Sequence, residues 1–134
     1  MTAKEYLAQI LACKMRLKTI GWELESLKSV LDCRTTNYEA PKVSLSNVNH
    51  TEGLIVTKLD LEQEMNDFEV RLTGIYTTIR EMPNPIHGAI ISGRYIVMKD
   101  WDDIAGELHL GVSRIFQLHR DALAELEKII VNYS

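Results

Sequence analysis

The 134-residue sequence has few of the residues that build a disulfide scaffold, a metal centre or a membrane span. Its two cysteines, Cys13 and Cys33, lie far apart without metal-ligand spacing, and we expect reduced thiols, with Cys13 in a core. The four histidines are scattered, so we expect no metal and no cofactor. No apolar run approaches the roughly 20 residues of a membrane span, and the first residues lack a signal-peptide pattern. These absences predict a cytoplasmic protein with no membrane contact.

Enzyme motifs are missing as well. The sequence contains no phosphate-binding glycine loop, no histidine-glutamate metal helix and no serine or cysteine nucleophile in a recognisable setting. We therefore expect no enzymatic activity. A basic excess is also absent, because 15 Lys and Arg stand against 19 Asp and Glu, which gives a net charge of −4. Since phosphate contacts supply much of the affinity of nucleic-acid binders, DNA binding requires a local patch, dimerisation or a partner.

Apolar residues recur in a heptad pattern along two long stretches, at about 2–32 and 52–82, which predicts two long helices. An irregular connector is expected between them, at 34–51. The two helices form an arm, residues 1–82, either as a hairpin within one chain or by pairing with a second copy. The seam residues that carry this expectation are Leu17, Leu24, Leu27, Leu31, Met65, Phe68, Leu72 and Ile75.

A proline pair in the segment 83–85 ends the second stretch, because proline lacks an amide hydrogen and disfavours helical geometry in the residue before it. The remaining residues, 84–134, form a separate head. Its first helix is expected over 86–98. Asp100 is placed to cap a short second helix over 101–109, with Asp103 at the capping-box position.

The last helix of the head is expected to run from Ser113, as its cap, to about Val131. The turn before it, 110–112, contains Gly111, which is free to adopt a positive φ angle. A short helix, a glycine turn and a longer helix are typical of a helix-turn-helix. The residues expected to point inward are Ile115, Leu118, Ala122, Leu126 and Ile129. The sequence thus predicts an all-α protein with a long helical hairpin and a C-terminal helix-turn-helix head.

Parts of the chain also resemble known proteins. Three segments of the head resemble region 4 of sigma-70-type transcription factors: Arg94-Tyr95-Ile96, Trp101-Asp102-Asp103-Ile104-Ala105 and Leu118-His119-Arg120-Asp121-Ala122-Leu123. Three upstream segments resemble small proteins that are encoded by phages and prophages of Gram-positive bacteria and are related to the ArpU-type regulators of late genes: Lys4-Glu5-Tyr6-Leu7, Val43-Ser44-Leu45-Ser46 and Lys58-Leu59-Asp60-Leu61-Glu62.

The resemblance implies a transcriptional regulator whose last helix lies in the major groove of double-stranded DNA. On the matching positions it implies base contacts from Arg114 and Gln117, with Ser113 at the start of the helix. The side chains suited to phosphates are Arg120, Arg94 and Lys99. The alternative for all of these residues is a solvated helix face. Tyr95, Trp101 and His119 are expected to pack inside the head.

Two functions remain open at this point. The first is a sequence-specific DNA-binding regulator that acts as a homodimer, with the arm holding two heads. From Asn84 onward, acidic residues outnumber basic ones, so a single head has few phosphate contacts to offer. The second is a helical adaptor that does not bind DNA and contacts host RNA polymerase or another protein through the arm. The acidic balance of the chain fits this second hypothesis at least as well.

Overall fold

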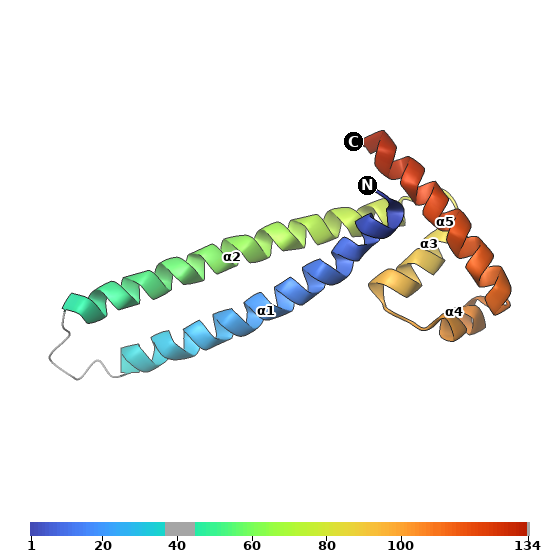
Figure 1. The fold of residues 1–134 in the computed structure, drawn as a ribbon. Coiled ribbons are helices and arrows are strands. Elements are labelled where there is room, and N and C mark those ends of the chain that lie inside the picture. The colour runs from blue at the N-terminus through green and yellow to red at the C-terminus, as the bar shows by residue number, and fades with distance from the viewer. Residues whose placement is uncertain (37–44, 134) are drawn as a thin grey trace. The chain divides into compact units, whose positions relative to one another are not determined.

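The computed structural model describes the backbone of residues 1–36 and 45–133, and the side chains of residues 1–32 and 51–132. All regular elements in these ranges are helical, as predicted, and none is a strand (Figure 1). None of the described helices combines the length and apolar character of a membrane span. The elements are α1 (Ala3–Thr36), α2 (Leu45–Arg80), α3 (Pro85–Ile91), the π-helical segment η1 (Ser92–Ile96), α4 (Trp101–Leu108) and α5 (Val112–Tyr133).

The two long helices extend further than the heptad pattern predicted. Helix α1 continues to Thr36 and α2 begins at Leu45, so both ends of the expected connector at 34–51 are helical. The middle of that connector, 37–44, lies outside the described residues. The helix-poor residues Ser46, Asn47 and Asn49 fall in the first turns of α2, where polar residues of this kind disturb a helix least.

The start of α1 has a capping box. The backbone amide of Glu5 donates to Thr2 Oγ1 at 3.2 Å, and the amide of Thr2 donates to Glu5 Oε2 at 3.3 Å. Two amides that have no partner inside the helix are satisfied reciprocally in this way. The sequence Thr-x-x-Glu therefore fixes the beginning of α1.

The chain divides into two compact units that do not follow the expected boundary at residues 82–84. One unit contains residues 1–13 and the chain from Arg71 onward, and the other contains Lys14–Val70. The first unit is larger than the expected head because the start of α1 and the end of α2 contribute to its core. That core consists of Ala3, Leu7, Ile10, Ile75, Ile79, Met82, Ile91, Ala122 and Leu126. Tyr6 adds a hydrogen bond from its hydroxyl to Thr78 Oγ1, at 3.1 Å.

The unit Lys14–Val70 has a smaller hydrophobic core, because it contains parts of α1 and α2 only. Ile20 and Leu61 are its buried hydrophobic residues among the described side chains. The other seam residues in it are half-buried: Leu17, Leu24, Leu27, Leu31, Met65 and Phe68. Arg16 joins the two helices through two hydrogen bonds to the carboxylate of Glu64, at 2.8 and 2.9 Å. This paired geometry lowers the pKa of Glu64 and raises that of Arg16.

The expected helix at 86–98 changes its hydrogen-bond pattern part of the way along. Asn84 caps α3, since its side-chain oxygen accepts from the amide of Ile86 at 3.0 Å. In η1 the pattern becomes π-helical, and the amide of Val97 donates to the carbonyl of Ser92 at 3.0 Å. Met98 then adopts a positive φ of 66° and ends the segment. The prediction of one regular helix was wrong here, because periodicity alone does not distinguish an α-helix from a single wider turn.

Candidate nucleic-acid interface

Helices α4 and α5 meet on a small hydrophobic core within the first unit. Its buried residues are Ile90, Ile104, Ala105, Ile115 and Leu118. The inward positions expected for α5 are confirmed, since Ile115, Leu118, Ala122 and Leu126 are buried and Ile129 is half-buried. Because these residues fix which side of α5 faces the protein, they also fix which side faces solvent.

The turn between α4 and α5 uses a different residue from the one expected. His109 adopts the left-handed conformation, with φ 56° and ψ 41°, whereas no described glycine has a positive φ. The amide of Leu110 donates to the carbonyl of Ala105 at 3.0 Å, and the amide of His109 donates to that of Gly106 at 3.3 Å. These two bonds form a Schellman motif, in which Leu110 packs back against the same core. Gly111, which is free to adopt a positive φ because it has no side chain, does not do so in this turn.

The expected side-chain caps of the two helices are also absent. Asp100 occupies the cap position of α4, but its side chain makes no capping bond, and only its carbonyl accepts, from the amide of Ile104 at 3.1 Å. Helix α5 begins at Val112, so Ser113 lies inside its first turn. The carbonyl of Gly111 accepts the amide of Ile115 at 3.0 Å, which places Gly111 in the cap position. Glycine is tolerated there.

Three side chains predicted to contact DNA lie exposed on α5: Arg114, Gln117 and Arg120. Arg114 Nη1 donates to Gln117 Oε1 at 3.2 Å, so the two expected base-contacting groups are neighbours. Arg120 has no hydrogen bond or ion pair with any described side chain. Ser113 is exposed as well. The predicted surface therefore has a guanidinium, an amide and a second guanidinium on one side of one helix.

The other two predicted phosphate contacts are engaged within the protein. Arg94 is half-buried, donates from Nη1 to the carbonyl of Lys99 at 3.1 Å, and lies with its guanidinium carbon 4.8 Å from the centre of the Trp101 ring. Lys99 Nζ lies 2.6 and 2.7 Å from the two carboxylate oxygens of Glu107. Their predicted roles would require these contacts to be exchanged for contacts with phosphate.

An aromatic cluster joins η1, α4 and α5. Tyr95 and His119 stack with ring centres 5.8 Å apart, and the Tyr95 hydroxyl lies 2.8 Å from His119 Nε2. Trp101 meets the ring of His119 edge-on at 4.7 Å, and that of Phe116 at 5.3 Å. Burial, and then the nearby positive charges of Lys4 and Arg94, lower the pKa of His119. Burial raises the pKa of Tyr95.

A second polar contact holds α3 to α5. His87 Nδ1 hydrogen-bonds to a carboxylate oxygen of Glu125, and the other carboxylate oxygen accepts from the backbone amide of Asn84 at 3.4 Å. His87 and Glu125 are largely shielded from solvent. The start of α3 and the middle of α5 are thus connected by side chains that the sequence pattern did not single out.

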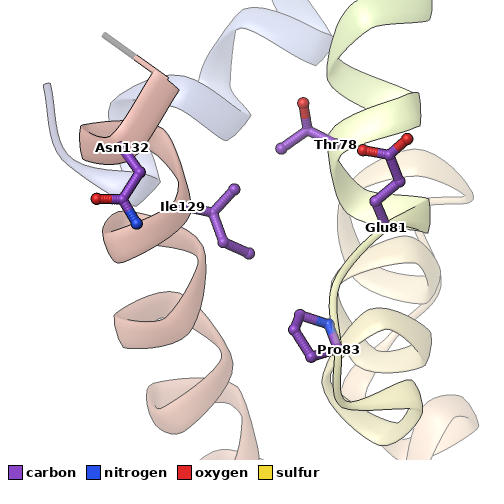
Figure 2. Close-up of a pocket in the computed structure, with 5 residues that line it drawn as sticks. All are labelled: Thr78, Glu81, Pro83, Ile129 and Asn132. Atoms are coloured by element: carbon purple, nitrogen blue, oxygen red, sulfur yellow. The ribbon is translucent and has the colours of Figure 1, made fainter.

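Figure 2 shows an open pocket between the end of α2 and the last turns of α5. Its volume is about 250 Å³, and it is lined by Thr78, Glu81, Pro83, Ile129 and Asn132. Pockets for small ligands have volumes of about 300–1,000 Å³ and several convergent polar groups. This pocket is smaller and has a single charged group, Glu81, so it offers little to a small-molecule effector.

In the described part of the chain, no three residues of the types His, Cys, Asp and Glu come together at a distance suited to a metal ion. Cys13 is buried with a free thiol. No protein-family model, curated protein or solved structure matches the chain.

Proposed function

We propose that this protein is a non-enzymatic DNA-binding transcriptional regulator of the phage or prophage late-gene type. In this proposal, α4, the turn at His109 and α5 act as a helix-turn-helix, and the first turns of α5 enter the major groove. The observation that carries the proposal is the division of α5 into two sides. Ile115 and Leu118 are buried, while Arg114, Gln117 and Arg120 are exposed at spacings of three residues.

The side chains on that surface suit the edges of bases and the phosphates beside them. Arginine donates two parallel hydrogen bonds to guanine, and the glutamine amide pairs in the same way with adenine. The hydrogen bond between Arg114 and Gln117 holds both groups near the start of the helix before DNA arrives. Arg120 follows two turns after Ser113 and is placed to contact a phosphate.

The long helices are proposed to form a hairpin arm. Two contacts support an antiparallel arrangement: Tyr6 with Thr78 in one unit, and Arg16 with Glu64 in the other. In this arrangement the seam residues are used within the chain. A homodimer, which the small number of phosphate contacts in one head favours, then needs a different surface.

A specific observation also favours the adaptor function. Two of the side chains predicted to contact phosphates already have partners within the protein. Arg94 donates a hydrogen bond to the carbonyl of Lys99, and the Lys99 ammonium group pairs with the carboxylate of Glu107. A surface with fewer available cations binds DNA less tightly. In the adaptor function, the arm contacts RNA polymerase or another protein, and the exposed face of α5 is solvated.

The test compares two charge-neutralising variants of the same helix. Selection from a random pool of DNA duplexes identifies a binding sequence for the wild-type protein, and a shift assay at two salt concentrations then measures its affinity. We expect the variant Arg114→Ala with Gln117→Ala to bind at least about thirtyfold more weakly, because two base contacts of about 1–3 kcal/mol each are lost.

Lys128→Ala is the matched control, since it removes one exposed positive charge from the same helix, about 21 Å further along at 1.5 Å per residue. It should bind almost normally. An unchanged DNA affinity of the double variant would contradict the assignment of Arg114 and Gln117 as base-contacting residues. A wild-type protein that selects no sequence and binds no duplex at low salt would favour the adaptor, with RNA polymerase as the first partner to assay.

A further inference from the structure

The outer side of α1 within the unit Lys14–Val70 has an apolar stripe that the single chain leaves uncovered. Met15 and Trp22 are each 62% exposed. At about 100° per residue, these two side chains lie on one side of the helix, opposite the seam residues Leu17 and Leu24. A tryptophan this exposed is uncommon on a surface with no partner, because it is the largest apolar side chain.

Charged residues continue the same stripe in a self-complementary order. Lys18 lies one turn before Trp22, and Glu25 lies one turn after it. Both are exposed, and neither makes an ion pair with any described side chain. When two copies of such a helix pair antiparallel about a two-fold axis near residues 21 and 22, Lys18 of each copy faces Glu25 of the other. The order of charges along this stripe is therefore complementary to the same stripe on a second copy.

The space beside Gly21 fits this arrangement. A Cβ atom built on Gly21 meets no other atom within 4 Å, so the backbone is open on that side. In the same antiparallel register, Trp22 of one copy lies over Gly21 of the other. A glycine in the middle of a helix costs about 1 kcal/mol relative to alanine. The close approach of the indole ring from a second copy would explain why this position has no side chain.

Helix α2 does not offer an equivalent surface for self-pairing. Its exposed apolar residues in this unit are Ile55, Val56, Leu59 and Val70, and the one basic residue within 51–70 is Lys58. The acidic residues of the same stretch are Glu52, Asp60, Glu62, Glu64, Asp67 and Glu69. Two copies of α2 therefore repel each other, and charge favours α1 as the two-fold contact.

We propose that the stripe Met15–Lys18–Trp22–Glu25 of α1 binds the same stripe of a second copy in antiparallel orientation and forms the homodimer, in a register that places Met15 of each copy beside Lys28 of the other. This inference deepens the proposed function by naming the dimer surface. It rests on the proposed function only for the role of the dimer, which is to hold two DNA-binding heads. The test uses the full chain without DNA, so its failure is distinct from a failure to bind DNA.

The experiment measures the mass in solution by sedimentation over a range of protein concentrations. We expect a concentration-dependent dimer for the wild type. Lys18→Glu and Glu25→Lys should each weaken it at least about a hundredfold, because each places like charges opposite each other twice. The combined variant should dimerise again. Lys18 and Glu25 are about 10.5 Å apart along one helix at 1.5 Å per residue, so the recovery cannot arise within one chain.

Two further variants complete the set. Trp22→Ala should also be monomeric, and Asp60→Lys on α2 is the matched control, which reverses an exposed acidic charge outside the stripe and should remain dimeric. Helical content by circular dichroism checks that each variant folds. The proposal is overturned by a wild type that is monomeric at every concentration, by a combined variant as weak as the single ones, or by a monomer that binds anionic lipid vesicles through Trp22.

Discussion

Ile115 is the residue on which the position of the exposed face of α5 depends most directly. It is 0% exposed, follows Arg114 in the chain and packs in the core with Ile90 and Ile104. Ile115→Ala removes three carbon atoms, and at about 0.8 kcal/mol per buried methylene the lost burial amounts to about 2.4 kcal/mol. The cavity adds about 24 cal/mol per Å³ where the surroundings do not collapse. We expect the free energy of unfolding to fall by about 3 kcal/mol.

The assay follows urea unfolding by tryptophan fluorescence in a Trp22→Phe background, where Trp101 is the remaining tryptophan. Trp101 packs against the same core, so it reports on the neighbourhood of Ile115. Ile115→Val should cost about 1 kcal/mol. Val131→Ala on the same helix is the control, because Val131 is 63% exposed, and it should change stability by less than about 0.5 kcal/mol. A loss below about 1 kcal/mol for Ile115→Ala would show that this core does not position α5.

Two shorter predictions concern charge in the same unit. The pKa of His119 lies below its usual 6.5 because of burial and the positive charges of Lys4 and Arg94. The stability that the neutral His119 side chain contributes should therefore be fully present above about pH 6.5 and be lost as the pH falls towards the folded-state pKa. His119→Gln should remove this pH dependence of the free energy of unfolding in urea titrations. An identical pH dependence in the variant contradicts the assignment. Glu107→Gln should strengthen DNA binding by releasing Lys99, whereas Glu127→Gln, which removes an exposed acid of α5, should change it less; equal effects would mean that only net charge matters.

The parts of the fold that the sequence predicts are those set by long periodic patterns. The heptad spacing places Cys13 and Ile75 on the inner sides of α1 and α2, and both are buried. In α5 the spacing of Ile115, Leu118 and Ala122 gives the inner side and, by exclusion, the exposed one. These predictions succeed because each residue contributes to the same periodic signal, so a single unusual residue does not change it.

The parts that the sequence does not predict depend on single residues or on contacts across the chain. Both His109 and Gly111 are able to adopt a positive φ, and the Schellman bonds, together with the packing of Leu110, place it at His109. The π-helical turn at Ser92–Ile96 has no periodic signature of its own. The pairing of Lys99 with Glu107 spans a helix boundary, so neither charge could be assigned a partner from helical spacing.

The same pairings bear on how the protein would bind DNA. With Arg94 and Lys99 engaged, the predicted surface retains Arg114 and Arg120 as cations without an ion pair among the described residues. The salt dependence of DNA affinity has a slope of about −0.9 per neutralised phosphate, so the phosphate contact assigned to Arg120 gives about −0.9 for one copy and about −1.8 for two. A regulator of this kind needs the dimer. Lys18→Glu should therefore weaken DNA binding although Lys18 belongs to the other compact unit, and the combined variant with Glu25→Lys should restore both properties together.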